Sequence, residues 1–224
     1  MEAATKGRVF SSVRRRLQPS SGLVYAERVN APAAPKERER EKKERAMTRA
    51  TLTHRLAHRD DLEALRALMD AAISELQKPF LDERQIVSSR AIMGLDTQLI
   101  DDGTYFIVEA DGELAGCGGW SRRATLYGGD QSPGRSAVLL DPAKDAARVR
   151  AMYTHPQHTR KGVGRLILSL CEEAARSEGF RTVELMATMA GEPLYRACGY
   201  EPCERVADDR GGVAVPLLRM SKPL

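Results

Sequence analysis

Tryptophan, cysteine and long apolar runs are all scarce in this sequence. It has one tryptophan and four cysteines in 224 residues, and no apolar run approaches the roughly eighteen residues that a membrane-spanning helix needs. Cys117, Cys171, Cys198 and Cys203 form no CxxC pair and have no metal-ligand spacing with the four histidines. We therefore expect reduced thiols in a cytoplasmic protein with no bound metal and no membrane partner.

A strong charge of one sign is also missing from most of the chain. The formal net charge is +4, but residues 1–46 hold 12 Lys and Arg against 6 Asp and Glu. The other residues therefore hold 23 of the 35 basic and 25 of the 31 acidic side chains, which leaves them at −2. This balance argues against a nucleic-acid partner for the folded part.

The sequence predicts a basic, disordered extension over residues 1–50 and a folded domain over residues 51–224. Lys36 to Arg45 are ten consecutive charged residues, and such a segment buries too little apolar surface to offset the entropy lost on ordering. Three interpretations stay open: a transit-like leader, a nucleic-acid-binding arm, or upstream sequence before a true start at Met47. We favour the third, because the regular pattern begins just after that methionine.

Helical and strand patterns alternate from Thr51 onward. Asp60, with Glu63 three residues later, has the spacing of a capping box before an apolar helical face that runs to Leu76. Two strand-like runs flank Asp111 and Gly112, the strongest hairpin signal in the chain. A loop rich in Gly, Pro and Ser follows over residues 125–145. This order predicts an α/β (α+β) domain.

The stretch TRKGVG places Gly162 and Gly164 where a new helical pattern begins, after a buried strand that ends before Pro156. The first amides of a helix have no intrahelical acceptor, and a glycine lets a ligand approach them closely. The helix N-terminus favours negative charge, and Arg160, Lys161 and Arg165 add positive charge around the same turn. The turn therefore fits a diphosphate.

Two common nucleotide motifs do not account for this turn. The chain has no GxxxxGK followed by Ser or Thr, and Ile167 stands where a dinucleotide fingerprint needs its third glycine. A lone GxG at a helix start is also common by chance, so the turn alone leaves a simple tight turn equally open.

The segments around the turn resemble the GNAT superfamily of N-acetyltransferases. THPQHTRKGVG, followed by EPLYRACGY at family-like spacing, carries the resemblance, which extends roughly from Leu52 to the C-terminus. It implies a mixed, mostly antiparallel central sheet flanked by helices and splayed between its fourth and fifth strands. One departure is Thr159, where the family usually has Gln or Arg, and this puts one side-chain contact to the diphosphate in doubt.

The resemblance implies that acetyl-CoA is the cosubstrate. Backbone groups in the splay would bind its pantetheine arm, and the amide of Met152 or Tyr153 would bind the thioester carbonyl. Tyr195, four residues before Gly199, matches the family's general acid. The residues that the resemblance assigns to the cosubstrate are Met152, Tyr153, Thr154, Thr159, Arg160, Lys161, Gly162, Val163, Gly164 and Arg165.

The general base is not identified by the sequence. Glu184, on the next strand-like run, is a weak candidate and fits a salt-bridged strand residue better. His155 and His158 fit a surface or turn role next to Pro156 better than a catalytic one. Deprotonation through water, or binding of a neutral amine, is equally compatible with the sequence.

The acceptor is expected to be a small-molecule amine, because the folded part shows no long acidic or basic groove. Residues 77–80 and the segment from Trp120 to Asp141 should frame it, although a sole tryptophan is more often a core residue. A homodimer is compatible with such folds. A non-catalytic acyl-CoA-binding module is the alternative to an enzyme.

Overall fold

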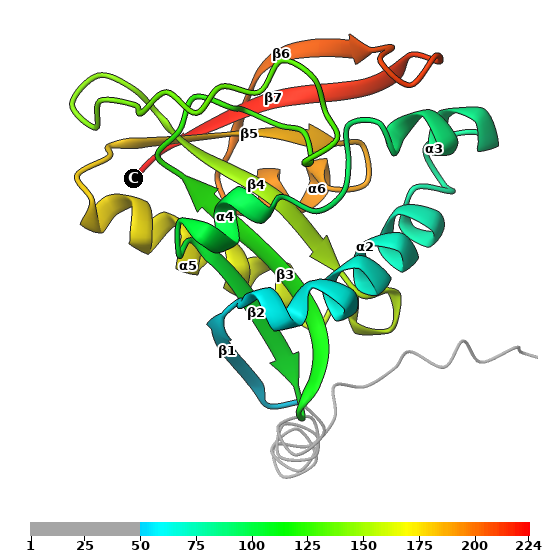
Figure 1. The fold of residues 1–224 in the computed structure, drawn as a ribbon, viewed down its shortest axis with the longest axis horizontal. Coiled ribbons are helices and arrows are strands. Elements are labelled where there is room, and N and C mark those ends of the chain that lie inside the picture. The colour runs from blue at the N-terminus through cyan, green and yellow to red at the C-terminus, as the bar shows by residue number, and fades with distance from the viewer. Residues whose placement is uncertain (1–49) are drawn as a thin grey trace, which may run out of the picture. The chain divides into compact units, whose positions relative to one another are not determined.

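The structure is a computed structural model and describes residues 50–224, so the predictions for residues 1–49 lie outside it. One seven-stranded sheet forms the centre of the domain (Figure 1). The strands are β1 (Leu52–Leu56), β2 (Tyr105–Ala110), β3 (Glu113–Ser121), β4 (Ala147–Thr154), β5 (Thr182–Thr188), β6 (Glu201–Asp208) and β7 (Val215–Pro223). The helices are η1 (Arg59–Asp61), α2 (Leu62–Leu76), α3 (Glu83–Ser89), α4 (Thr97–Asp101), η2 (Pro156–His158), α5 (Val163–Ser177) and α6 (Glu192–Ala197). None of these helices is long and apolar enough to cross a membrane.

The sheet is mostly antiparallel, with the strand order β1-β2-β3-β4-β5-β7-β6. Only β4 and β5 pair in parallel, and their ladder is limited to Ala147 with Val183 and Arg148 with Glu184. Beyond these two pairs the strands diverge. The predicted fold class, a mixed sheet splayed between its fourth and fifth strands, is therefore confirmed.

The hairpin between β2 and β3 forms where the sequence predicts it. Asp111 has φ 52° and Gly112 has φ 87°, the left-handed conformations that a tight two-residue hairpin turn needs. Asp111 also accepts a hydrogen bond from the Thr51 amide at 2.9 Å, which ties the start of β1 to this turn. The hairpin thus fixes the register of the first three strands.

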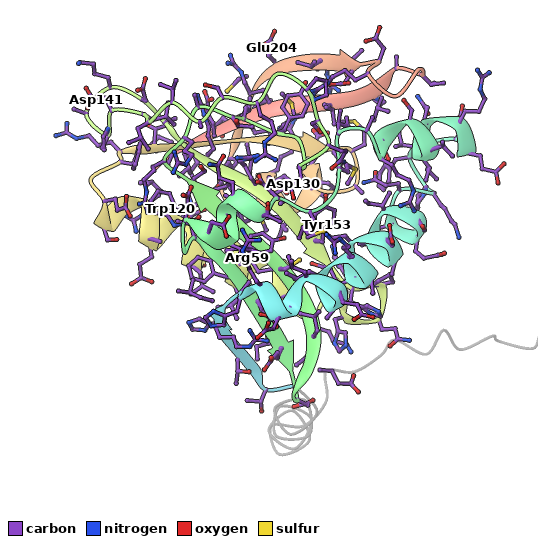
Figure 2. All side chains as sticks on the ribbon, viewed as in Figure 1. Arg59, Trp120, Asp130, Asp141, Tyr153 and Glu204 are labelled. Carbon is purple, nitrogen blue, oxygen red and sulfur yellow. The ribbon has the colours of Figure 1, made fainter. Side chains whose placement is uncertain are left out.

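Helices cover both faces of the sheet. Consecutive strand residues point to opposite faces, so Ile107 packs in the cluster with α2 and α4 while Val108 packs in the cluster with α5. Trp120, labelled in Figure 2, belongs to the α5 cluster and meets Phe180 edge to face at 6.0 Å. Glu204, on the edge strand β6, is exposed (Figure 2).

Two glycines on β3 let α5 approach the sheet closely. A Cβ on Gly116 would lie 2.4 Å from Val163 Cγ1, and one on Gly118 would lie 2.6 Å from Ile167 Cγ2. A side chain at either position would therefore require Val163 or Ile167, both on α5, to move. Because Val163 is the first residue of α5, this contact also fixes where the helix starts.

The predicted capping box at Asp60 and Glu63 is wrong. The chain enters α2 through the short η1 turn, so the residue before the helix is Asp61. The Asp61 carboxylate accepts the His58 amide at 2.8 Å and pairs with Arg55 through both oxygens. The capping interaction of Asp61 therefore stabilises the start of η1, and Asp60 lies inside that turn.

Candidate functional site

A β-bulge lies in β4 three residues beyond the last residue that pairs with β5, Arg148. Gly118 of β3 stands between Cys117, which pairs with Tyr153, and Gly119, which pairs with Arg150, so it faces both Ala151 and Met152. Ala151 has φ 50°, a left-handed conformation that is rare for a residue with a side chain. The Tyr105 hydroxyl donates to the Ala151 carbonyl at 2.7 Å and holds the bulge. The backbone from Met152 onward is thereby turned toward the splay.

The turn before α5 presents a row of free backbone amides. Arg160 has φ 62° and Gly162 has φ 94°, and the first backbone bond of the helix is Leu166 N–H to Gly162 O at 3.0 Å. Within residues 50–224, none of the amides of Arg160 to Arg165 donates a hydrogen bond to the protein. Such amides at a helix N-terminus form an anion-binding site.

The Thr159 side chain forms a hydrogen bond within the turn. Its hydroxyl donates to the Pro156 carbonyl at 3.1 Å, which closes the η2 turn. The Thr159 hydroxyl is therefore engaged within the turn, and the contact of residue 159 with a diphosphate stays a prediction.

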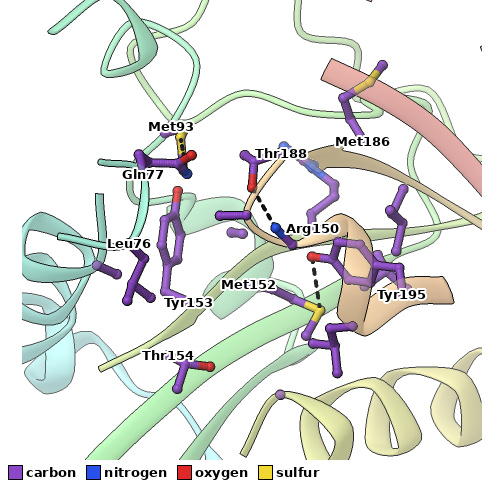
Figure 3. A pocket seen from close by; sticks show the side chains of 18 of the residues that line it. Leu76, Gln77, Met93, Arg150, Met152, Tyr153, Thr154, Met186, Thr188 and Tyr195 are labelled. Atoms are coloured by element: carbon purple, nitrogen blue, oxygen red, sulfur yellow. Dashed lines mark hydrogen bonds between the residues drawn. The ribbon is translucent and has the colours of Figure 1, made fainter. Parts of the chain in front are cut away.

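One cavity of about 820 Å³ joins this turn to the splay. All of the residues predicted to bind the cosubstrate line it, except Lys161, and Tyr195 lines it as well. The other end of the cavity is lined by Gln77, Phe80, Met93, Leu126 and Tyr127. Figure 3 shows Leu76, Gln77 and Met93 on one side of the cavity and Tyr195 on the other. The cavity therefore has a turn end rich in free amides and an apolar far end.

Tyr195 lies on α6 with its hydroxyl in the cavity wall. The residue is 9% exposed, and its hydroxyl is 4.0 Å from Met152 Sδ (Figure 3). Burial raises the pKa of Tyr195 well above its ordinary value, so the phenol stays protonated at neutral pH. A protonated hydroxyl with only a weak partner is free to donate to an atom in the cavity.

Tyr153 connects the bulged strand to the loop before α4. Its hydroxyl accepts the Gly94 amide at 2.8 Å. Burial raises the pKa of this phenol as well. The tyrosine therefore positions the loop, and its backbone rather than its hydroxyl is presented to the splay.

Of the three candidate bases, Glu184 and His155 do not line the cavity, whereas His158 does. Glu184 forms an ion pair with Arg148 on the neighbouring strand, as expected for a salt-bridged residue. His155 caps η2 by accepting the Gln157 amide at 3.3 Å. His158 lies in the η2 turn, one of the two roles expected for it, but it is only 8% exposed and lines the cavity, so it is not a surface residue. Burial, together with nearby Lys161, lowers the pKa of His158, so this histidine is neutral near pH 7.

Trp120 plays no part in the site. It is 2% exposed in the core, where the Arg122 guanidinium lies 5.3 Å from the centre of its ring. Of the segment from Trp120 to Asp141, which was expected to frame the acceptor, only residues 126–128 line the cavity.

Sequence reasoning missed Arg150 and the Ala151 bulge. Arg150 lines the cavity, is 4% exposed and pairs with Asp96, which lies 54 residues earlier. An arginine in the middle of a strand expected to be buried is the signal that could have marked it. Nothing in the sequence marks Ala151, because alanine has no preference for a left-handed conformation.

The comparisons with known proteins agree with this geometry. Residues 65–200 match the model of the Acetyltransferase (GNAT) family, which covers more than half of the chain. The chain therefore belongs to the GNAT acetyltransferase family, and the reaction class of that family is acyl transfer. A comparison with curated protein sequences gives no match.

Three solved structures share the fold at low sequence identity. A GCN5-related N-acetyltransferase from Rhodopseudomonas palustris is 19% identical, with a TM-score of 0.59 over 80% of this chain and 99% of that one. The PaiA N-acetyltransferase from Thermoplasma acidophilum, in complex with coenzyme A, is 15% identical, with a TM-score of 0.52 over 78% and 99%. YncA from Salmonella typhimurium, a putative acetyltransferase with its cofactor acetyl-CoA, is 20% identical, with a TM-score of 0.51 over 77% and 94%.

Proposed function

We propose that the protein is an acetyl-CoA-dependent N-acetyltransferase that moves an acetyl group to the primary amine of a small molecule in a ternary complex. The observation that carries the proposal is the continuous cavity, which joins the amide row before α5 to the splay of β4 and β5. The coenzyme A and acetyl-CoA complexes of PaiA and YncA, which have the same fold, support this choice of cosubstrate.

The residues at the turn end fit the diphosphate of coenzyme A. The amides of Arg160 to Arg165 supply donors, and Gly162 and Gly164 leave space for close approach. The side chains of Arg160 and Arg165 line the same end of the cavity and add positive charge. Binding would therefore depend mainly on the backbone and would not require a long side chain at Thr159.

The splay would hold the rest of the cosubstrate. From Val149 to Thr154, β4 has no partner on its β5 side, and its backbone can bond the pantetheine arm as if it were a strand. The Met152 amide, just after the bulge, is the candidate donor to the thioester carbonyl. Acetyl-CoA supplies the activated acetyl group when it is bound.

Tyr195 would donate its proton to the departing sulfur. Its hydroxyl is protonated at neutral pH and has no strong partner among residues 50–224. Among the residues that line the cavity there is no Asp or Glu, and the histidine among them, His158, belongs to the η2 turn, next to the residues proposed to bind the diphosphate. We therefore propose that the amine is bound in its neutral form or loses its proton through water.

An amine-panel assay tests the proposal. The full chain is mixed with acetyl-CoA and single amines, and thiol release is followed together with acetylated product by mass spectrometry. Turnover on at least one amine, lost in Gly162→Glu, supports the enzyme. Calorimetric binding of acetyl-CoA without turnover on any amine would instead favour a non-catalytic acyl-CoA-binding module.

A further inference from the structure

The far end of the cavity has an apolar wall built from separate segments of the chain. Met93, Tyr127 and Met186 line the cavity and pack against one buried cluster, which comprises Leu81, Ile92, Val215 and Leu217. Each of these three residues remains partly exposed, as do Leu76 and Leu126, which line the same cavity (Figure 3). The wall therefore presents apolar surface to a molecule that enters the cavity.

Phe80 adds an exposed aromatic ring to this wall. It is 48% exposed, and of the five large hydrophobic residues that are exposed within residues 50–224, it alone lines the cavity. Phe80 also belongs to none of the three hydrophobic clusters in this part of the chain. Because covering such a ring is favourable, its exposed surface favours an apolar ligand.

The polar side chains at the far end are engaged by the protein. The Tyr127 hydroxyl donates to the Asp208 carboxylate at 2.9 Å, and the Tyr153 hydroxyl accepts the Gly94 amide at 2.8 Å. Gln77 is only 4% exposed. The far end therefore offers few polar atoms to a ligand.

The far end also presents no accessible charge within residues 50–224. Arg150 lines the cavity, but its side chain is 1% exposed and its charge is paired with Asp96. Its Nη2 donates to the Gly128 carbonyl at 3.1 Å. No Asp or Glu lines the cavity, and Arg160 and Arg165 lie at the turn end. A second charged group on the acceptor would therefore lose water without gaining a partner.

We propose, building on the function proposed above, that the acceptor is a primary amine with an uncharged, apolar body, an alkyl chain or an aromatic ring. The body would lie against Phe80, Met93 and Leu126, and the amine would point toward the splay. An apolar environment disfavours the charged form of an amine. The same wall would thus favour the neutral amine that attack on the thioester requires.

The acetyl transfer itself is the one proposed above. The amine nitrogen bonds to the acetyl carbon as the carbon–sulfur bond breaks. Tyr195 protonates the departing sulfur, and the proton released from the nitrogen returns to Tyr195 through water. The apolar wall takes no part in these steps and acts on which amine is bound.

A series of linear amines tests the apolar body on the unaltered full chain. Propylamine, butylamine, pentylamine and hexylamine have nearly the same amine pKa and differ only in apolar length. We expect kcat/KM to rise about 3- to 4-fold for each added methylene, the effect of burying one such group. A kcat/KM that does not rise from propylamine to hexylamine would overturn the proposal.

Acceptors of equal length test the exclusion of charge. Cadaverine, aminopentanol and aminohexanoate have the chain of hexylamine with its terminal methyl replaced by an ammonium, a hydroxyl or a carboxylate. We expect hexylamine to be preferred at least about 10-fold over each, as kcat/KM per concentration of unprotonated amine. Equal or better turnover of cadaverine or aminohexanoate would contradict the proposal.

Variants of Phe80 test where the apolar body lies. Phe80→Ala should lower kcat/KM for hexylamine about 10-fold, mainly through KM, and leave that for propylamine within about twofold. Phe80→Leu should retain most of the preference for the longer amine. Val87→Ala is the control, because Val87 is 68% exposed but does not line the cavity. A dependence on chain length that is unchanged in folded Phe80→Ala would count against the proposal.

These outcomes are distinguishable from a failure of the proposed function. If no amine is acetylated although acetyl-CoA binds, the N-acetyltransferase itself is wrong. If amines are acetylated without regard to apolar length or to a second charge, only the apolar acceptor is wrong.

Discussion

Replacing Tyr195 with phenylalanine tests the proposed general acid with little disturbance of the fold. The hydroxyl has one weak contact, to Met152 Sδ at 4.0 Å, so its removal leaves no strong partner unpaired. We expect the free energy of unfolding to change by less than about 1 kcal/mol. The turnover number should fall about 100-fold or more, the effect of losing a general acid, which corresponds to about 3 kcal/mol of transition-state stabilisation.

Tyr200 supplies a matched control for this variant. Its ring meets that of Tyr195 at 5.9 Å, and it is 1% exposed, but it does not line the cavity. Tyr200→Phe removes the same atom from the same cluster and should leave kcat unchanged. The assay is thiol release at saturating acetyl-CoA, with acetyl-CoA affinity measured by calorimetry. A kcat for Tyr195→Phe within about twofold of the wild type would refute the acid role.

Four further results are expected. Because burial raises the pKa of Tyr195 above the ordinary value of about 10, kcat should not fall with rising pH below about pH 10. A fall in kcat below that pH that is absent in Tyr195→Phe would contradict this prediction. Gly162→Glu should abolish detectable acetyl-CoA binding. Gly212 has a similar φ of 93° but does not line the cavity, so the Gly212→Glu variant should bind acetyl-CoA normally despite the same backbone strain of about 1 kcal/mol. Gly116→Val should lower the free energy of unfolding by about 3 kcal/mol in urea titrations, since its Cβ alone would lie 2.4 Å from Val163 Cγ1; an unchanged midpoint would show that α5 can shift. Arg55 lowers the pKa of Asp61 to about 2, so this ion pair stabilises the fold above about pH 4. Its contribution to the free energy of unfolding, less than about 1 kcal/mol, should be lost as the pH falls from about 4 to 2, and Asp61→Asn should remove this pH dependence.

The parts of the fold that the sequence predicts are set by local chemistry. Asp111 and Gly112 adopt left-handed conformations that few other pairs tolerate, so the hairpin could be predicted from two residues. The same holds for the Gly162 turn, where φ is 94°. The Asp60 cap failed because the η1 turn precedes the helix, and the carboxylate of Asp61, held by Arg55, accepts the His58 amide at the start of that turn.

The parts that could not be predicted depend on contacts between distant segments. The splay was expected only from the family resemblance, because nothing local shows where two strands stop pairing. The bulge at Ala151 is held by Tyr105, and the charge of Arg150 is held by Asp96. Both partners come from segments more than 40 residues away, and no periodicity connects them to β4.

The coenzyme A affinity of the full chain tests the central claim most directly. Isothermal titration with acetyl-CoA should give a saturable heat with a dissociation constant in the micromolar range, typical of enzyme substrates, that free coenzyme A competes for. The absence of heat and of competition at millimolar concentration would contradict the claim that the amides of Arg160 to Arg165 form a diphosphate site.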